Sequence, residues 1–247
     1  MLEIPFYRKS IDSINDSYLR SAMADNCSKF INDFENDFKK YIGCEYAVST
    51  INAYTAIHLA LCAVDIKRGD KILCSVNIHP SIPSAIRQFD AEPIFVDVDE
   101  TTYNLDLDKL QETLKERKVK KLRGIVVSFI GGQPIDMDKF AQIVRKNKIF
   151  VIEDATDALG ATFKNKRIGS FNADMTIFSF MPFRKNIPAQ GAMLTTNDDE
   201  LYEKAILMRN HAIKKDETKT IEYLYDVVGA GCDYNISGVD AAYCRTV

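Results

Sequence analysis

The chain has 247 residues, of which 46% are hydrophobic and 27% are charged, and its formal net charge is -3. That length is enough for one large α/β domain or two small ones, and the balanced charge gives no electrostatic argument for a nucleic acid or a membrane surface as partner. We see no apolar run long enough to cross a bilayer, and we expect no signal peptide at residues 1–5. The six cysteines form no C-x-x-C pair, so we expect a cytoplasmic protein with reduced thiols and without a zinc site.

From the N-terminus onward, apolar residues first recur at helical spacing and then gather in short runs. Phe30, Phe34 and Phe38 share one face of a predicted helix that Gly43 ends, and residues 52–63 form a second helix that is short and apolar. Strands are predicted at the apolar runs 71–74, 93–98, 124–129, 149–154, 175–178 and 192–195. Further helices are predicted after residue 80, from about residue 106, over 136–146 and over 198–209. Short apolar strands that alternate with helices predict an α/β fold in three layers, with a mostly parallel sheet covered by helices on both faces.

The last part of the sequence is less regular. Residues 214–219 are charged and have no apolar period, so we expect a mobile loop there. Residues 231–247 are predicted to form an ordered loop that enters a helix, with Val239, Ala242 and Tyr243 at the start of its buried face. A domain that stopped inside such a helix would be unusual, and we therefore expect the sequence to be a truncated version or a fragment of a longer protein.

Polar residues follow four of the predicted strands, at the edge where open parallel sheets bind their ligands. These segments are 75–79, 128–133, 154–157 and 179–185. The helix that begins at residues 52–55 adds free backbone N–H groups and a positive dipole end, which suits a phosphate. An aspartate, a lysine, a ring and a phosphate cradle around one crevice would suit pyridoxal 5'-phosphate (PLP), because an aspartate such as Asp154 would keep its pyridine nitrogen protonated.

A set of segments resembles one known family in order and spacing. The segments are Ala53–Leu61, Phe95–Asp99, Gly132–Met137, Val151–Ala161, Ile168–Phe171, Phe178–Phe180 and Arg209–His211. Over essentially its whole length the chain is similar to the fold-type I, PLP-dependent nucleotide-sugar aminotransferases of the DegT type. The resemblance implies that residues 1–247 form the family's large domain, with the small C-terminal domain absent or truncated. It also implies a homodimer with the active site at the subunit interface.

The resemblance implies a role for each residue of the crevice. Asp154 would pair with the pyridine nitrogen, and His79 would stack on the cofactor ring. Ser179 and the backbone amides of Ala53 and Tyr54 would bind the cofactor phosphate. Each side chain also has a purely structural interpretation, as a strand-end cap for Asp154, a backbone-bonded strand serine for Ser179 and a loop histidine for His79.

The lysine that would bind the cofactor covalently is ambiguous. Counted without gaps, Arg184 stands at the family's Schiff-base position, and Lys185 follows one residue later. Residues 185–187 match the family's Lys-Asn-Ile if one residue is inserted before them and one is deleted after them. A lysine can lose its proton and attack an aldehyde, whereas an arginine stays charged and cannot. Both alignments stay open, and the chemistry favours Lys185 as the catalytic residue.

Further departures from the family gather around the same cofactor. Asp157 stands where a glutamine or histidine contacts the phenolic oxygen, and an anion there should weaken cofactor binding. Tyr54 replaces a threonine of the phosphate cradle. Asp233 replaces an asparagine that reaches the partner subunit's phosphate, and Asn235 replaces an arginine. Together these changes leave the catalytic assignment open.

Three hypotheses follow from these observations. The first is a PLP-dependent aminotransferase that moves an amino group from an amino acid, such as glutamate or glutamine, to a nucleotide-linked keto sugar in surface-polysaccharide or glycan synthesis. The second is a non-catalytic family member that has lost the cofactor and binds a nucleotide sugar or a partner subunit. The third is a PLP- or PMP-dependent sugar dehydratase in which another residue replaces the lysine.

Overall fold

The computed structural model describes residues 16–24, 27–116, 119–171, 173–180, 190–215 and 225–245. The helices are α1 (Asp16–Ala24), α2 (Cys27–Ile42), α3 (Ala53–Ala63), α4 (Ser81–Gln88), α5 (Leu107–Glu116), the short 3-10 helix η1 (Ile130–Gly132), α6 (Met137–Asn147), α8 (Asp199–Arg209) and α9 (Gly238–Arg245). The strands are β1 (Tyr46–Thr50), β2 (Lys71–Ser75), β3 (Glu92–Val96), β4 (Leu122–Ser128), β5 (Phe150–Asp154), β6 (Thr162–Phe163), β7 (Lys166–Arg167), β8 (Met175–Ser179), β9 (Ala192–Thr196), β10 (Ile213–Lys215) and β11 (Tyr225–Val227).

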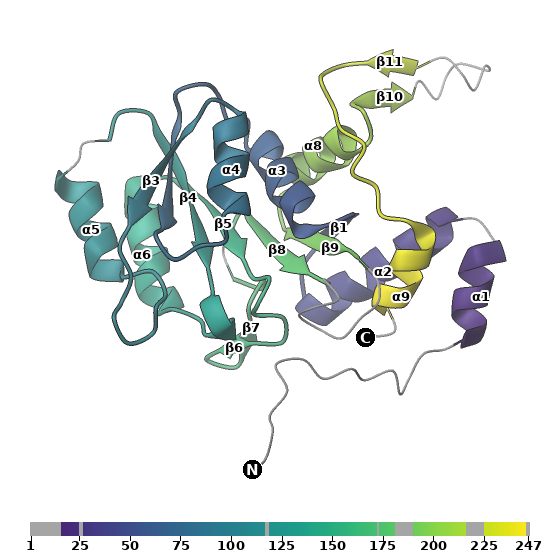
Figure 1. The fold of residues 1–247 in the computed structure, drawn as a ribbon, viewed down its shortest axis with the longest axis horizontal. Helices are drawn as coiled ribbons and strands as arrows, with labels where there is room; N and C mark the ends of the chain where they lie inside the picture. Colours follow the sequence, from purple (N-terminus) through teal and green to yellow (C-terminus); the bar gives the residue numbers. More distant parts are fainter. Residues whose placement is uncertain are drawn as a thin grey trace, which may run out of the picture.

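A seven-stranded sheet runs through the centre of the described chain, in the order β1-β9-β8-β5-β4-β2-β3 (Figure 1). Strands β3, β2, β4, β5 and β8 pair in parallel, whereas β9 runs antiparallel to both of its neighbours. Because β1 is antiparallel to β9, it points the same way as the five parallel strands. The mostly parallel sheet predicted from the sequence is therefore confirmed, and its parallel carboxyl ends meet along one edge.

Helices cover both faces of this sheet and enclose two separate hydrophobic cores. On one face α3, α4 and α8 pack on side chains such as Ile152 and Ile177. On the other face α2, α5, α6 and α9 pack on side chains such as Val151 and Phe178. Neighbours in a strand point to opposite faces, so Val151 and Ile152 belong to different cores. This arrangement is the three-layer fold that the sequence predicted.

Local sequence signals explain how the first elements begin and end. Gly43 ends α2 with a positive φ of 85°, and its N–H donates to the carbonyl of Lys39 at 2.8 Å. Asn52 caps α3, because its side chain accepts from the N–H of Thr55 while the Thr55 hydroxyl oxygen accepts from the N–H of Asn52. The cap therefore fixes the point at which the end of β1 turns into α3.

The structure corrects two expectations near the C-terminal end. Lys214 and Lys215 lie in β10, which pairs with β11, and not in a loop; residues 216–219 are outside the described residues. Val239 is 40% exposed and does not belong to the buried side of α9, which includes Gly238, Ala241 and the expected Ala242. The strand β1 and the short β6–β7 hairpin were not predicted, because both are brief and their pairing partners are distant or poorly marked in the sequence.

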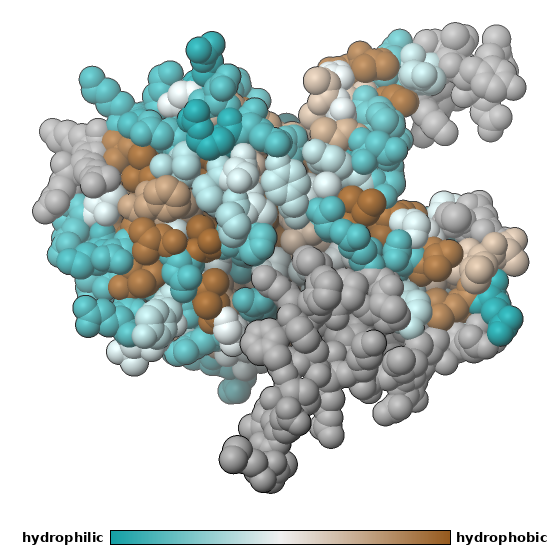
Figure 2. Space-filling model, in the orientation of Figure 1, coloured by the Kyte–Doolittle hydropathy of each residue, from teal (hydrophilic) through white to brown (hydrophobic). Residues whose placement is uncertain are grey.

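The surface shown in Figure 2 mixes hydrophilic and apolar groups, and the apolar ones lie on the body of the molecule and on the β10–β11 hairpin that projects from it in Figure 1. Tyr225, Val227 and Val228 are all more than half exposed at this hairpin. Within the described ranges, no helix combines the length and the apolar character that crossing a membrane requires.

Candidate cofactor site

The carboxyl ends of the parallel strands bring polar residues together at one edge of the sheet. Ser128, the last residue of β4, lies opposite Asp154, the last residue of β5, in the parallel register. Asp154 in turn lies opposite Ile177 of β8, two residues before Ser179. Gly132 lets the loop after β4 approach the loop after β5, because a Cβ at this position would lie 2.8 Å from the carbonyl oxygen of Asp157. The sheet register therefore assembles the site.

A cavity of about 230 Å³ opens at this edge. Five residues that the sequence singled out line it: Ala53, Tyr54, His79, Asp154 and Ser179. They come from the start of α3, the loop before α4, and the ends of β5 and β8. The structure thus places these five side by side around one hollow, while the role of each in binding stays a prediction.

The other predicted residues do not join this cavity in the described part of the chain. Asp157 is exposed and is not among the residues that line it. Arg184 and Lys185 lie outside the described residues, so the choice between them stays a prediction. The cavity is lined in addition by Ser81, Thr156 and Gln190, which were not predicted as site residues. The position of Thr156 two residues after a strand-end aspartate was an available signal, because such a backbone N–H often bonds back to the carboxylate.

Asp154 is a buried carboxylate held by neutral donors. It is 4% exposed, Oδ2 accepts from the hydroxyl of Ser128 at 2.7 Å, and Oδ1 accepts from the N–H of Thr156 at 3.2 Å. No lysine or arginine of the described residues forms an ion pair with it. Burial raises the pKa of Asp154, and the two hydrogen-bonding partners act in the opposite direction. A buried carboxylate that borders a cavity without a cationic partner favours a ligand that carries a positive N–H group.

The N-terminus of α3 provides the opposite electrostatic character in the same cavity. The capping box engages the N–H of Thr55, and the first bond within the helix is donated by the N–H of Ala56 to Asn52. The N–H groups of Ala53 and Tyr54 therefore belong to the helix end that has no partner inside the helix. Such an end, with its positive dipole, binds a phosphate readily. A phosphate subsite and an aspartate for a ring N–H fit the two polar ends of PLP.

His79 is held at the rim of the cavity by the first turn of α4. Its Nδ1 accepts from the N–H of Ser81 at 3.2 Å and lies 2.8 Å from the Ser81 hydroxyl. Because a backbone amide can only donate, the neutral ring carries its proton on Nε2. The ring is thus oriented by backbone as well as side-chain contacts, as a residue that stacks on a planar ligand requires.

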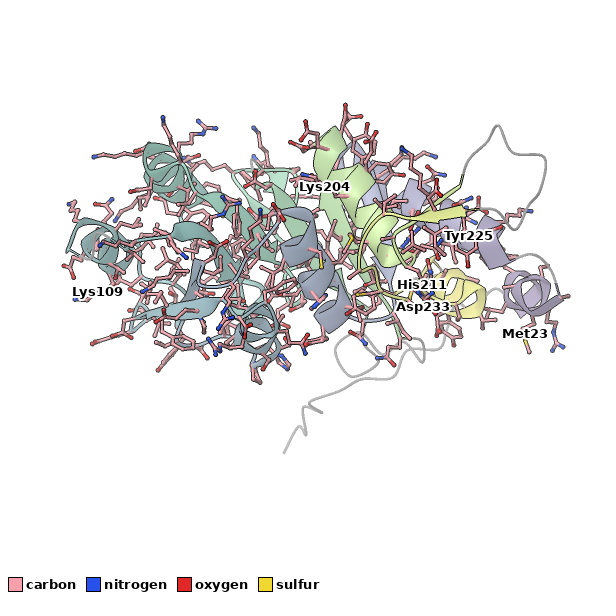
Figure 3. The ribbon with its side chains drawn as sticks, turned by 90° about the horizontal axis from the view of Figure 1, so that it is seen from above. Met23, Lys109, Lys204, His211, Tyr225 and Asp233 are labelled. Atoms are coloured by element: carbon pink, nitrogen blue, oxygen red, sulfur yellow. The ribbon has the colours of Figure 1, made fainter. Side chains whose placement is uncertain are left out.

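Asp233 and Asn235 lie away from the cavity, at the base of the β10–β11 hairpin. Figure 3 shows His211 and Asp233 beside each other there, far from Lys109 on α5. His211 Nε2 lies 3.9 Å from Asp233 Oδ2, and the Asn235 amide donates to Asp233 Oδ1 at 3.3 Å. Within one chain these residues form a separate polar cluster on the surface.

A larger cavity of about 440 Å³ lies on the opposite face of the sheet, between α6 and the β6–β7 hairpin. Glu153 lines it, is 1% exposed, and accepts from the Thr176 hydroxyl at 2.9 Å. Burial raises the pKa of Glu153 to about 7. None of the predicted cofactor residues lines this second cavity, so the smaller one is the candidate cofactor site.

Comparison with known proteins places the chain in a family. The chain is 32% identical over 213 residues to an uncharacterized protein of Methanocaldococcus jannaschii. This aligned stretch covers 85% of the chain and 54% of the relative. It is 33% identical over 214 residues to a GDP-perosamine synthase of Caulobacter vibrioides, and this aligned stretch covers 87% of the chain and 55% of that enzyme. The X-ray structure of the aminotransferase from Psychrobacter cryohalolentis has a TM-score of 0.84 at 26% identity, over 98% of this chain and 62% of that one.

The chain thus spans little more than half the length of these curated relatives. The match to the family extends over residues 8–246 and includes the end of every strand that lines the cavity. It also agrees with the three-layer fold and the parallel sheet order described above. On this evidence the chain belongs to the DegT/DnrJ/EryC1/StrS aminotransferase family.

Proposed function

We propose that the protein serves the PLP-dependent transamination of a nucleotide-linked keto sugar, in surface-polysaccharide or glycan synthesis, with an amino acid as the amino donor. The observation that carries the proposal is the single cavity that joins the buried Asp154 carboxylate to the open N-terminus of α3. A relative named GDP-perosamine synthase supports the substrate class. We also propose that residues 1–247 form the family's large domain and work as a homodimer in the cytoplasm.

The residues present fit the cofactor at both of its polar ends. Asp154 would hold a proton on the ring nitrogen, because a buried carboxylate stabilises the positive charge there. The N–H groups of Ala53 and Tyr54 and the Ser179 hydroxyl would hold the phosphate. His79 would cover one face of the ring. When bound, PLP supplies an electron sink for the exchange of an amino group and a keto group.

Lys185 is the residue we propose for the covalent link to the cofactor and for proton transfer during the reaction. A neutral lysine amine is a nucleophile and a base near neutral pH once its pKa is lowered, whereas Arg184 stays charged. Arg184 instead suits an anion contact. Both residues are outside the described residues, so this assignment rests on their chemistry and on the family resemblance.

A second candidate function is a non-catalytic role, and one observation favours it. The negative charge of Asp157 raises the pKa of Asp154 further, beyond the effect of burial. An anion so placed opposes the ionised carboxylate that the cofactor nitrogen needs. A protein that binds a nucleotide sugar or a partner subunit without chemistry would tolerate this charge.

The test is to add PLP to the full chain, record the visible absorption, reduce with borohydride and map the labelled peptide. Aminotransferase function predicts a pyridoxyl group on Lys185, lost in Lys185→Ala and retained in the matched control Arg184→Ala. Bound cofactor without a covalent label supports the dehydratase. Absence of both colour and label at saturating PLP would contradict both enzymatic functions and leave the non-catalytic one.

A further inference from the structure

We infer that Ser128 is a positioning residue, which holds the Asp154 carboxylate in the orientation that a ring N–H in the cavity requires. This role rests on the proposed function, because it assigns Ser128 to the binding of the PLP ring. The parallel register sets Ser128 directly opposite Asp154 at the ends of β4 and β5. Both side chains are almost fully buried, at 3% and 4% exposed.

The hydrogen bond between them is charge-assisted when Asp154 is ionised. The Ser128 hydroxyl lies 2.7 Å from Oδ2 of Asp154. A serine has one O–H donor, and an ionised carboxylate can only accept, so the donor of Ser128 is committed to Asp154. The N–H of Thr156 donates to the other oxygen, Oδ1, at 3.2 Å. Each oxygen therefore has at least one donor, and a hydrogen bond from the Thr156 side chain also acts on the carboxyl group. Together these donors fix the plane of the carboxylate.

This anchoring leaves acceptor capacity for a ligand. A carboxylate offers about four lone-pair sites, and Ser128 and Thr156 supply three hydrogen bonds, two from side chains and one from a backbone N–H. Asp154 lines the cavity, so the acceptor capacity that is left faces a donor placed there. Binding sites require their polar groups within about 10–20° of the productive orientation, which a freely rotating carboxylate would not maintain.

Ser128 also acts on the charge of Asp154. Burial raises the pKa of this carboxyl group and the charge of Asp157 adds to that effect, whereas the bond from Ser128 lowers it. Among the described residues, the other titratable side chains that line the cavity are His79 and Tyr54. Ser128 thus favours the ionised form of Asp154 that a protonated ring nitrogen needs, whereas burial and the charge of Asp157 oppose that form.

Ser75 at the end of β2 provides a matched control. It is 3% exposed, like Ser128, and it ends a parallel strand at the same edge of the sheet. Its hydroxyl oxygen accepts from the N–H of Asn77 at 3.2 Å, and no hydrogen bond joins it to Asp154 among the described residues. Ser75→Ala therefore removes an equivalent buried hydroxyl without touching the carboxylate.

The experiment compares wild type, Ser128→Ala, Ser128→Thr and Ser75→Ala in the full 247-residue chain. The first readout is the pKa of Asp154 from the ¹³C signal of its carboxyl group, measured without cofactor and assigned with Asp154→Asn. We expect a higher pKa in Ser128→Ala, a value close to wild type in Ser75→Ala, and restoration in Ser128→Thr. The second readout is the dissociation constant for PLP, which should rise about tenfold in Ser128→Ala and stay within about twofold in Ser75→Ala.

The outcomes separate this inference from the proposed function. An Asp154 pKa that is the same in Ser128→Ala and wild type overturns the inference, whether or not PLP binds. A raised pKa with unchanged PLP affinity also overturns it, because the carboxylate then needs no positioning. If wild type binds no PLP, the proposed function fails, while a raised pKa still supports the hold of Ser128 on Asp154. Should Ser128→Ala not fold, Ser128→Cys replaces it, because a thiol of similar shape is only a weak donor.

Discussion

Glu153 and Asp154 are adjacent in β5, yet they serve opposite faces of the sheet. Asp154 borders the candidate cofactor cavity, whereas Glu153 borders the larger cavity beside α6. Alternation along a strand explains the separation, because successive side chains point to opposite sides. Both carboxyl groups are buried, and burial raises the pKa of each. Only Asp154 has a predicted ligand to offset the cost of its charge.

Glu153 should therefore make the protein less stable as pH rises. Its pKa is raised from 4.5 to about 7 in the folded chain, so between these values the folded state binds a proton that the unfolded state has lost. The stability that this proton contributes to the folded state is fully present below about pH 4.5 and is lost as the pH rises through about 7. We expect Glu153→Gln to abolish this dependence of stability on pH. Above about pH 7, the unfolding free energy of Glu153→Gln should exceed that of wild type by roughly 3 kcal/mol.

The measurement is urea unfolding of both proteins across this pH range. Glu45→Gln, at an exposed position, controls for the loss of one negative charge. Parallel pH profiles for wild type and Glu153→Gln would show that the Glu153 carboxyl group does not control this part of the stability.

The start of α3 links the stability of this helix to the proposed phosphate subsite, because the same residues serve both. Asn52 completes the capping box and also lines the cavity. Asp198 caps α8 in a similar way, through the N–H of Leu201 at 3.0 Å, and does not line that cavity. Asn52 and Asp198 are thus helix caps of the same kind, and of these two only Asn52 lies at the site.

Removing each cap should separate the two effects. Asn52→Ala and Asp198→Ala should each lower the unfolding free energy by about 1 kcal/mol, the usual contribution of an N-cap side chain. Only Asn52→Ala should also weaken PLP binding, because a frayed first turn misplaces the N–H groups of Ala53 and Tyr54. Chemical denaturation and PLP titration of both variants check this. Equal losses of PLP affinity would exclude a specific role for the start of α3.

For the whole molecule, ligand binding should appear as global stabilisation. A ligand that binds only the folded chain raises its stability by about 2.7 kcal/mol at a hundredfold excess over its dissociation constant, which corresponds to roughly 5–10 °C in Tm for a chain of this length. We expect this increase with PLP and a smaller one with pyridoxal, which lacks the phosphate. Thermal unfolding followed by circular dichroism measures both. An equal shift for the two compounds would contradict the phosphate subsite at α3.

The sequence by itself determined the architecture and pointed to five of the ten described residues that line the candidate cavity. Helical and strand periodicities are local, so α2, α3, α6, α8 and the apolar strands were predicted close to their observed bounds. The rule that parallel strands bind ligands at their carboxyl ends, together with the family resemblance, selected Asp154, Ser179 and the start of α3. The residues of these segments that line the cavity could therefore be identified from the sequence alone.

Only the tertiary structure decided which residues touch. The register that sets Ser128 opposite Asp154 depends on contacts between β4 and β5, and no local pattern in either strand specifies it. The same holds for β1, which joins the sheet beside β9, some 150 residues later in the chain. Thr156 differs, because its N–H bonds to Asp154 only two residues away, within a local turn. Pairing between distant segments is a property of the packed molecule, and so Ser128, the partner that orients Asp154 from β4, became visible only in the fold.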